Sequence, residues 1–174
     1  MPIKMVGHIG LCVSDLDRAL RFWCDGLGFE VLRGAPFYGS SWKRVMEIDD
    51  DLYLQTKMIR RDHLKLEILY FEKPGHRGTA ERRPMNKLGF THLAVWVRDI
   101  EEVAKRVVDY GGSIVESTRT KFDHPKLQGK WLICTDPDGI RVELVEYPDG
   151  ESVLESIWNV MEGENVIGRN VSEF

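Results

Sequence analysis

Long hydrophobic runs are missing from this sequence. No stretch approaches the roughly 18–20 apolar residues that a membrane span needs, and the first residues do not resemble a signal peptide. Cysteine is also scarce: Cys12, Cys24 and Cys134 are odd in number and show no ligand spacing. This usage is typical of a reducing compartment. We therefore expect a cytoplasmic protein with no membrane partner, whose cysteines are small buried hydrophobic residues.

The sequence also lacks a basic excess. Its formal net charge is −4, and from Asp149 onward six acidic residues stand against one base, Arg169. The tail therefore carries −5 and the rest of the chain +1, which argues against a nucleic-acid partner. The 174 residues are 43% hydrophobic and 30% charged, which fits one globular domain, 1–174, with room for a sizeable core.

What the sequence does contain is an internal repeat. His8–Val13 (His-Ile-Gly-Leu-Cys-Val) returns as His92–Val97 (His-Leu-Ala-Val-Trp-Val). Each half also closes on a similar strand-forming segment, Lys65–Leu69 in the first and Arg141–Val145 in the second. Each copy thus opens with a His and closes with a Glu. A duplicated unit that keeps both residue types points to a four-ligand metal site between the copies.

The four repeated residues share one orientation in their strands. Strand side chains alternate between two faces, so each His and each Glu lies opposite an aliphatic face that suits packing against a helix. Two equivalent modules related by a pseudo-twofold axis could bring all four to one point. The predicted ligands are His8, Glu67, His92 and Glu143.

The repeat divides the chain into parts. We expect a first module at about 5–71, a linker at 72–88, a second module at about 89–147 and a tail at 148–174. Apolar spacing predicts a helix in each module, about 15–27 and 100–110. Strands are expected around them, including one at 43–48 in the first module. The tail has partial helical spacing, which favours a short amphipathic helix packed on the body over a lid or a dimer contact.

Four motifs carry a family resemblance: Ser14–Ala19 after His8, the strand around Glu67, Phe90–Ala94, and Asp136–Leu144. Together they resemble the vicinal oxygen chelate superfamily, which includes glyoxalase I, methylmalonyl-CoA epimerase, bleomycin-resistance proteins and extradiol dioxygenases. The resemblance implies an α+β fold of two tandem βαβββ modules forming a U-shaped, metal-centred open barrel. It also implies one divalent ion (Zn, Ni, Co, Mn or Fe), a small-molecule substrate and a homodimer.

The resemblance implies a metal-dependent lyase or isomerase of the glyoxalase I-like type. Such an enzyme acts on a small carbonyl compound through a metal-bound enediolate or enolate, with Glu67 or Glu143 moving the proton. Glu67 matches the glyoxalase I order of His, Glu, His, Glu, whereas the epimerase has Gln in second place. The 25-residue gap from Glu67 to His92 is more epimerase-like. The subfamily therefore stays open at this point.

Three alternatives share the scaffold. Extradiol dioxygenases hold Fe(II) with two His and one Glu, which would be His8, His92 and Glu143, and His124 lies where they carry a catalytic His. Ile133 stands where their active-site Tyr would be, which counts against this reading. Fosfomycin-type thiol transferases also use two His and one Glu. A drug-sequestering binding protein would use the fold without a metal.

Aromatic and basic residues offer candidate substrate contacts. Trp96 is favoured because it shares a face with His92, and Phe37, Trp42 and His124 are further candidates for the pocket. Two basic groups could hold an anionic substrate such as a CoA phosphate or a glutathione carboxylate, and a solvated face is an equally good interpretation of them. These groups are Lys57, Arg60, Arg61 and Lys65 before Glu67, and Arg77, Arg82, Arg83 and Lys87 in the linker.

Overall fold

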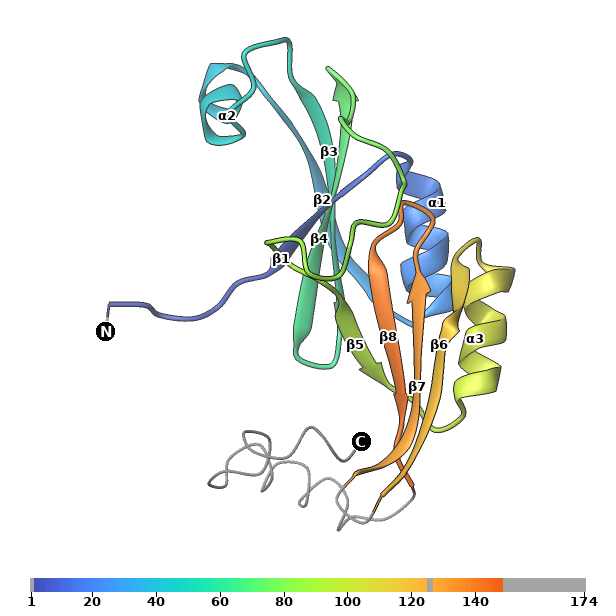
Figure 1. The fold of residues 1–174 in the computed structure, drawn as a ribbon. Helices are drawn as coiled ribbons and strands as arrows, with labels where there is room; N and C mark the ends of the chain where they lie inside the picture. Colours follow the sequence, from blue (N-terminus) through green and yellow to red (C-terminus); the bar gives the residue numbers. More distant parts are fainter. Residues whose placement is uncertain (1, 125–126, 149–174) are drawn as a thin grey trace.

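The structure is a computed structural model that describes residues 2–124 and 127–148 of the chain. It contains two four-stranded sheets in the order βαβββ twice, with a short extra helix between the second and third strands of the first module (Figure 1). The elements of the first module are β1 (Ile9–Val13), α1 (Leu16–Leu20), the π-helical turn η1 (Arg21–Gly26), β2 (Glu30–Tyr38), α2 (Ser40–Val45), β3 (Tyr53–Arg61) and β4 (Leu64–Lys73). Those of the second are β5 (Leu93–Trp96), α3 (Ile100–Asp109), β6 (Ser113–His124), β7 (Leu127–Thr135) and β8 (Arg141–Glu146).

The two sheets have the same topology. Their strand orders are β1-β4-β3-β2 and β5-β8-β7-β6, with the first strand of each module parallel to the last and the remaining pairs antiparallel. This duplication confirms the α+β class and the paired βαβββ modules expected from the repeat. The sheets are separate, and no closed barrel forms in the described part of the chain.

The helices α1 and α3 each start where the sequence places a capping residue. Asp15 accepts a hydrogen bond from the Arg18 amide, and Asp99 accepts from the amides of Glu101 and Glu102. These carboxylates satisfy N–H groups that the first helical turn leaves unpaired. Both helices begin directly after a first strand, which places them on the aliphatic face of their own sheet.

One hydrophobic core joins the two modules. Phe22 and Trp23 from η1 are fully buried and pack in edge-to-face geometry with ring centroids 5.4 Å apart. They belong to the same cluster as Val107 of α3 and Leu132 of β7. A Cβ added at Gly112 would lie 2.6 Å from Phe22, so only glycine allows this close approach. The aliphatic faces of both sheets therefore share one interior.

Polar contacts also cross between the modules. Ser14 donates its backbone N–H and its hydroxyl to the Asp138 carboxylate, at 3.0 and 2.5 Å. Arg106 of α3 donates to the backbone carbonyls of Asp25 and Gly26 at the end of η1. These bonds fix the position of one module against the other.

The strand expected at 43–48 is wrong. The segment forms α2, with Lys43 donating to the Gly39 carbonyl at 3.0 Å and Met46 to the Trp42 carbonyl at 2.9 Å. Local hydrogen bonds of this kind satisfy the backbone without a neighbouring strand. The helix stands at the outer end of β2 and β3, away from the second sheet (Figure 1).

Some bounds differ from those expected. β1 begins at Ile9 rather than near residue 5, and residues 74–92 form neither helix nor strand. Cys134 is fully buried, and burial raises the pKa of its thiol to about 12, whereas Cys12 is exposed, contrary to expectation. The tail helix and its possible roles concern residues 149–174, which lie outside the described part.

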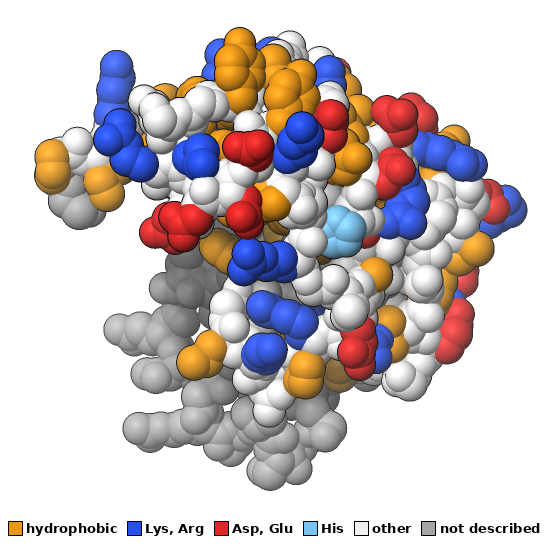
Figure 2. All heavy atoms as spheres, turned by 90° about the horizontal axis from the view of Figure 1, so that it is seen from above, with side chains coloured by type: hydrophobic (Ala, Val, Ile, Leu, Met, Phe, Trp, Pro, Cys, Tyr) orange, Lys and Arg blue, Asp and Glu red, His pale blue; other side chains and the backbone are white. Residues whose placement is uncertain are grey.

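The surface mixes charges and exposed apolar side chains. Seen from above, Lys and Arg side chains alternate with Asp and Glu on the visible face (Figure 2). Among residues 2–124 and 127–148, no helix has both the length and the apolarity that crossing a membrane requires. Five of the six most exposed large hydrophobic residues in the described part flank the two histidines in sequence: Ile3, Met5, Val6, Leu88 and Phe90.

Candidate metal centre in two halves

The first half of the candidate site is the pair His8 and Glu67. His8 precedes β1, and Glu67 lies in the middle of the adjacent parallel strand β4, where its register partner is Gly10. The His8 Nε2 lies 3.0 Å from the Glu67 Oε2. The carboxylate side chain is 16% exposed and the imidazole 42%, so both functional groups reach the surface.

The second half repeats this arrangement. His92 precedes β5, and Glu143 of β8 has Ala94 as its register partner, again two residues after the His. The His92 Nε2 lies 3.5 Å from the Glu143 Oε2. The Thr91 hydroxyl lies 2.9 Å from the other ring nitrogen, Nδ1, and so helps to set the orientation of the imidazole.

Each pair has the geometry of two ligands of one ion. Metal ions such as Zn²⁺ bind imidazole nitrogen and carboxylate oxygen at about 2.0–2.2 Å, so two such ligands at a right angle are roughly 3 Å apart. The observed separations of 3.0 and 3.5 Å are close to this spacing. Imidazole and carboxylate together suit Zn, Ni, Co, Mn or Fe, so the donor set fits the expected divalent ion.

The four predicted ligands do not meet at one point within the chain. Two ligands are too few to hold a catalytic ion, which normally has at least three protein ligands. No group of three or more His, Cys, Asp or Glu side chains lies at ligating distances within the described residues. The chain therefore presents two separate halves.

Aromatic side chains adjoin the second half. Trp96, which strand alternation places on the face of His92, contacts Tyr147 edge-to-face at 5.6 Å, and Tyr147 contacts Trp131 at 5.5 Å. Burial and, second, the negative charge of Glu143 raise the pKa of the Tyr147 hydroxyl. The sequence indicated Trp96 as a pocket residue, but Tyr147 and Trp131 were missed. The even spacing from Glu143 could have revealed Tyr147, whereas Trp131 comes next to it only through the pairing of β7 with β8.

The other pocket candidates lie apart. Phe37 of β2 and Trp42 of α2 stack on each other with centroids 4.0 Å apart. Glu67 of β4 pairs with Met58 of β3, and Met58 pairs with Arg33 of β2. Phe37 lies further along β2, about 13 Å from Arg33 and so from the level of Glu67. The side chain of His124 lies outside the described part.

Asp136 is the most perturbed carboxyl group near the second half. It is 2% exposed, and burial raises its pKa to about 6 although the amides of Asp138 and Ile140 and the Trp23 indole bind it and oppose the shift. Those bonds close the turn between β7 and β8 and attach it to η1. Asp136 therefore acts in the structure rather than at the His92–Glu143 pair.

Comparison with known proteins adds independent observations. The model of the glyoxalase/bleomycin resistance protein/dioxygenase superfamily matches residues 5–144. A protein named 2-epi-5-epi-valiolone epimerase from Actinomyces sp. is 26% identical over 151 residues, which are 83% of this chain and 80% of the relative. A protein named probable lactoylglutathione lyase from Synechocystis is 28% identical over 141 residues, 80% of this chain and 92% of the relative.

Solved structures agree on the fold. The crystal structure of a glyoxalase family protein from Bacillus cereus superposes with a TM-score of 0.71 at 20% identity, covering 84% of this chain and 95% of its own. At this identity the likeness concerns the fold alone. The paired modules described above are therefore an arrangement that solved proteins also adopt.

Proposed function

Because the chain belongs to the glyoxalase/bleomycin resistance protein/dioxygenase superfamily, we propose that it is a metal-dependent lyase or isomerase acting on a small carbonyl compound. One observation carries the proposal: both modules hold a His and a Glu in the same register with their functional atoms 3.0 and 3.5 Å apart. Packing alone would not require two polar residues to recur on the surface side of both sheets. The lyase and epimerase names of the two relatives support the same class.

A second copy of the chain completes the site in this proposal. Each chain offers two half-sites, and a homodimer in which the first module of one copy faces the second module of the other would assemble two four-ligand centres. Exposed apolar residues support such a contact, since Val6 is 86% exposed beside His8 and Phe90 is 83% exposed beside His92.

The proposed chemistry divides between the ion and the protein. A divalent ion bound between the halves would polarise the substrate carbonyl as a Lewis acid. His8 and His92 supply nitrogen ligands, and the Thr91 hydroxyl keeps the His92 ring in position. Glu67 or Glu143 removes the proton α to the carbonyl with a carboxylate oxygen and delivers it to the neighbouring carbon. Both carboxylates are largely shielded from water, which favours proton transfer to the substrate.

Elemental analysis combined with turnover tests this function. The wild type is compared with His8→Ala and Glu67→Ala, and His63→Ala, an exposed histidine of the turn after β3, serves as the control. We expect a stoichiometric divalent metal in the wild type and the control, and loss of the metal and of methylglyoxal–glutathione or epimerase turnover in both site variants.

Two outcomes would contradict the proposal. Iron retained in Glu67→Ala together with oxygen uptake on catechols would identify a dioxygenase, because that chemistry needs only His8, His92 and Glu143. Absence of metal from the reconstituted wild type, with a small molecule still bound, would identify a binding protein.

A further inference from the structure

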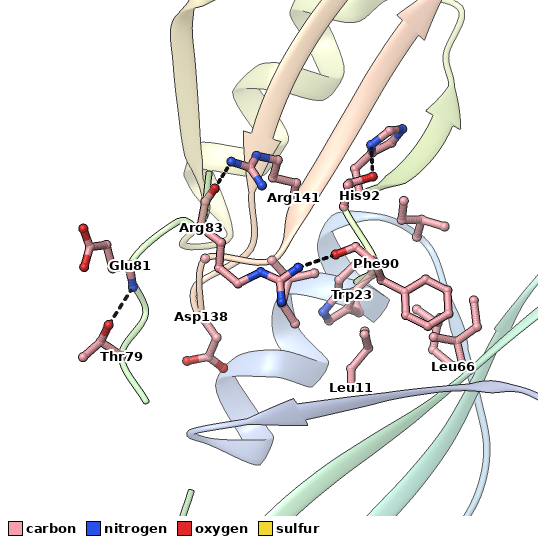
Figure 3. A pocket seen from close by; sticks show the side chains of 15 residues that line it. Leu11, Trp23, Leu66, Thr79, Glu81, Arg83, Phe90, His92, Asp138 and Arg141 are labelled. Carbon is pink, nitrogen blue, oxygen red and sulfur yellow. Dashed lines mark hydrogen bonds between the residues drawn. The ribbon is translucent and has the colours of Figure 1, made fainter. Parts of the chain in front are cut away.

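Three arginines gather where the linker crosses the end of the second sheet. Arg82 and Arg83 come from the linker, and Arg141 begins β8. Arg83 and Arg141 line two adjoining cavities of about 310 and 360 Å³, and Arg82 lines the latter. In Figure 3 the Arg141 guanidinium group binds the backbone carbonyl of Arg83, and the Arg83 side chain extends to the carbonyl of Phe90.

Arg141 is a buried cation without a carboxylate partner. It is only 7% exposed, and within the described residues the one hydrogen bond of its side chain goes from a guanidinium Nη to the Arg83 carbonyl oxygen. Within the described residues none of Arg82, Arg83 and Arg141 takes part in an ion pair. No buried side-chain nitrogen in the described part lacks a hydrogen-bond partner, so the remaining N–H groups of Arg141 open onto the cavities.

The charges of the three arginines oppose one another. Arg141 is buried, and Arg82 and Arg83 carry the same charge beside the same cavity. Buried charges in proteins are normally paired, because leaving water costs free energy that an opposite charge must offset. An anion between these guanidinium groups would remove both costs.

Two acids that line the first cavity, Asp138 and Glu81, form no ion pair with these arginines within the described residues. Asp138 binds Ser14 and also pairs with Arg18 at 2.9 Å. Glu81 points away from Arg83 and Arg141 (Figure 3). The cavities therefore have a cationic wall beside the apolar side chains of residues such as Trp23.

The linker is held in place over the cluster. Arg83 donates to the Phe90 carbonyl at 2.9 Å, which closes the linker into a loop. Gly139 has φ +80, and a Cβ there would lie 2.3 Å from the Ala80 carbonyl oxygen, so the linker lies directly on the turn before β8. The linker backbone that carries Arg82 and Arg83 is thus fixed by packing next to the start of β8, where Arg141 lies.

The cluster adjoins the second half-site. Arg141 and Glu143 are two residues apart in β8, so their side chains share a face and their Cα atoms are about 6.6 Å apart. Ile133, which pairs with Glu143 across β7 and β8, lines the same cavity as Arg141 and Arg82.

We propose that Arg82, Arg83 and Arg141 form a binding site for an oxyanion, a carboxylate or a phosphate group. Guanidinium groups bind such anions through paired, charge-assisted hydrogen bonds. The further step, that the anion belongs to the substrate whose carbonyl reaches Glu143, rests on the proposed function. The substrate class is then a small carbonyl compound that also carries an acidic group. The distance from this group to the reacting carbon would match the spacing of Arg141 and Glu143, about 6.6 Å between their Cα atoms.

Calorimetric titration with inorganic phosphate and with acetate tests the site itself. The titrations use the full chain after EDTA treatment and removal of the EDTA by dialysis, so that neither a metal nor the chelator competes for the anion. The variants are Arg82→Gln, whose side chain is exposed and makes no hydrogen bond in the described structure, and Arg141→Gln. Arg77→Gln, an exposed linker arginine outside the cluster, is the control.

We expect phosphate or acetate to bind the wild type and the control equally, and at least about tenfold more weakly to both cluster variants. Tighter phosphate binding assigns the site to a phosphate group, and tighter acetate binding assigns it to a carboxylate. If neither anion binds the wild type, or if both bind Arg82→Gln as well as the wild type, the inference is overturned. Arg82→Gln keeps the test valid even if Arg141→Gln fails to fold.

The outcome is separable from that of the metal analysis. Anion binding that depends on Arg82 in a protein without metal would leave the oxyanion site in place and contradict the proposed function alone. A metal-binding, active protein that ignores both anions would contradict only the inference drawn from the arginines.

Discussion

The indole N–H of Trp23 in the first module donates to the Asp136 carboxylate in the second, at 3.3 Å. Both side chains are almost fully buried, and Asp136 also accepts from the amides of Asp138 and Ile140. This contact ties the turn that leads to Glu143 to the helix that follows His8. Changes to the Trp23–Asp136 contact should therefore change the free energy of unfolding.

The pKa of Asp136 predicts a pH-dependent stability. Burial raises this pKa to about 6 in the folded chain, against about 3.9 in an unfolded one. Between these values the folded state binds more protons than the unfolded state. The contribution of Asp136 to the free energy of unfolding is therefore fully present below pH ~4 and is lost as the pH rises through ~6. The loss amounts to at most about 3 kcal/mol. Urea unfolding of the wild type and Asp136→Asn over this range measures it, since the effects of other groups cancel in the difference. A constant difference would refute the assignment.

Removal of the Trp23 side chain should leave a large cavity in the shared core. Trp23→Ala is expected to lower the free energy of unfolding by about 3–5 kcal/mol, because the ring contacts Phe22 and Phe29 edge-to-face. Trp42→Ala removes an indole from the exposed helix α2 and should cost clearly less. Equal losses in the two variants, measured by denaturant unfolding, would contradict the burial of Trp23 in the core.

Gly139 should resist substitution for two separable reasons. Its φ is +80, and an added Cβ would meet the Ala80 carbonyl oxygen, whereas Gly75 has φ +96 with nothing within 4 Å. Gly75→Ala should cost about 1–2 kcal/mol from backbone strain alone, and Gly139→Ala should cost more because the linker must also move. If thermal and denaturant unfolding give both variants the same stability, the linker does not lie on this turn.

The carboxylates should control turnover more than substrate binding. Glu67→Gln and Glu143→Gln keep an oxygen ligand but lose the proton acceptor, so we expect kcat to fall by about 10²–10⁴ in whichever variant lacks the base, with metal content largely retained. Steady-state kinetics and metal analysis on the same preparations measure this. Full activity in both variants would exclude both carboxylates as the base.

Much of the fold could be predicted because the repeat is local and regular. His8–Val13 and His92–Val97 both alternate, and Asp15 and Asp99 both cap the helix that follows. Strand alternation also placed Glu67 and Glu143 opposite the aliphatic faces, and the structure pairs them with His8 and His92.

What could not be predicted depends on contacts between distant segments. Apolar residues at 42–48 occur at spacings compatible with a strand or a helix, and only the absence of a neighbouring strand decides for α2. The position of the linker over β8 is likewise not encoded in a periodic pattern, so the meeting of Arg82 and Arg83 with Arg141 was missed. The division of the four ligands into two halves depends on how the two modules are placed against each other. The alternation of side chains along a strand predicts which face a residue lies on, but not this placement.

A complementation experiment tests the central claim that two copies share the site. One variant carries His8→Ala and Glu67→Ala, the other His92→Ala and Glu143→Ala, and each alone should bind no metal. If each centre combines the first module of one copy with the second of its partner, mixed dimers contain one intact centre, and an unfolded and refolded equimolar mixture should regain about a quarter of the wild-type metal content and activity. A mixture that stays without metal although mixed dimers have formed would contradict a site shared between two copies.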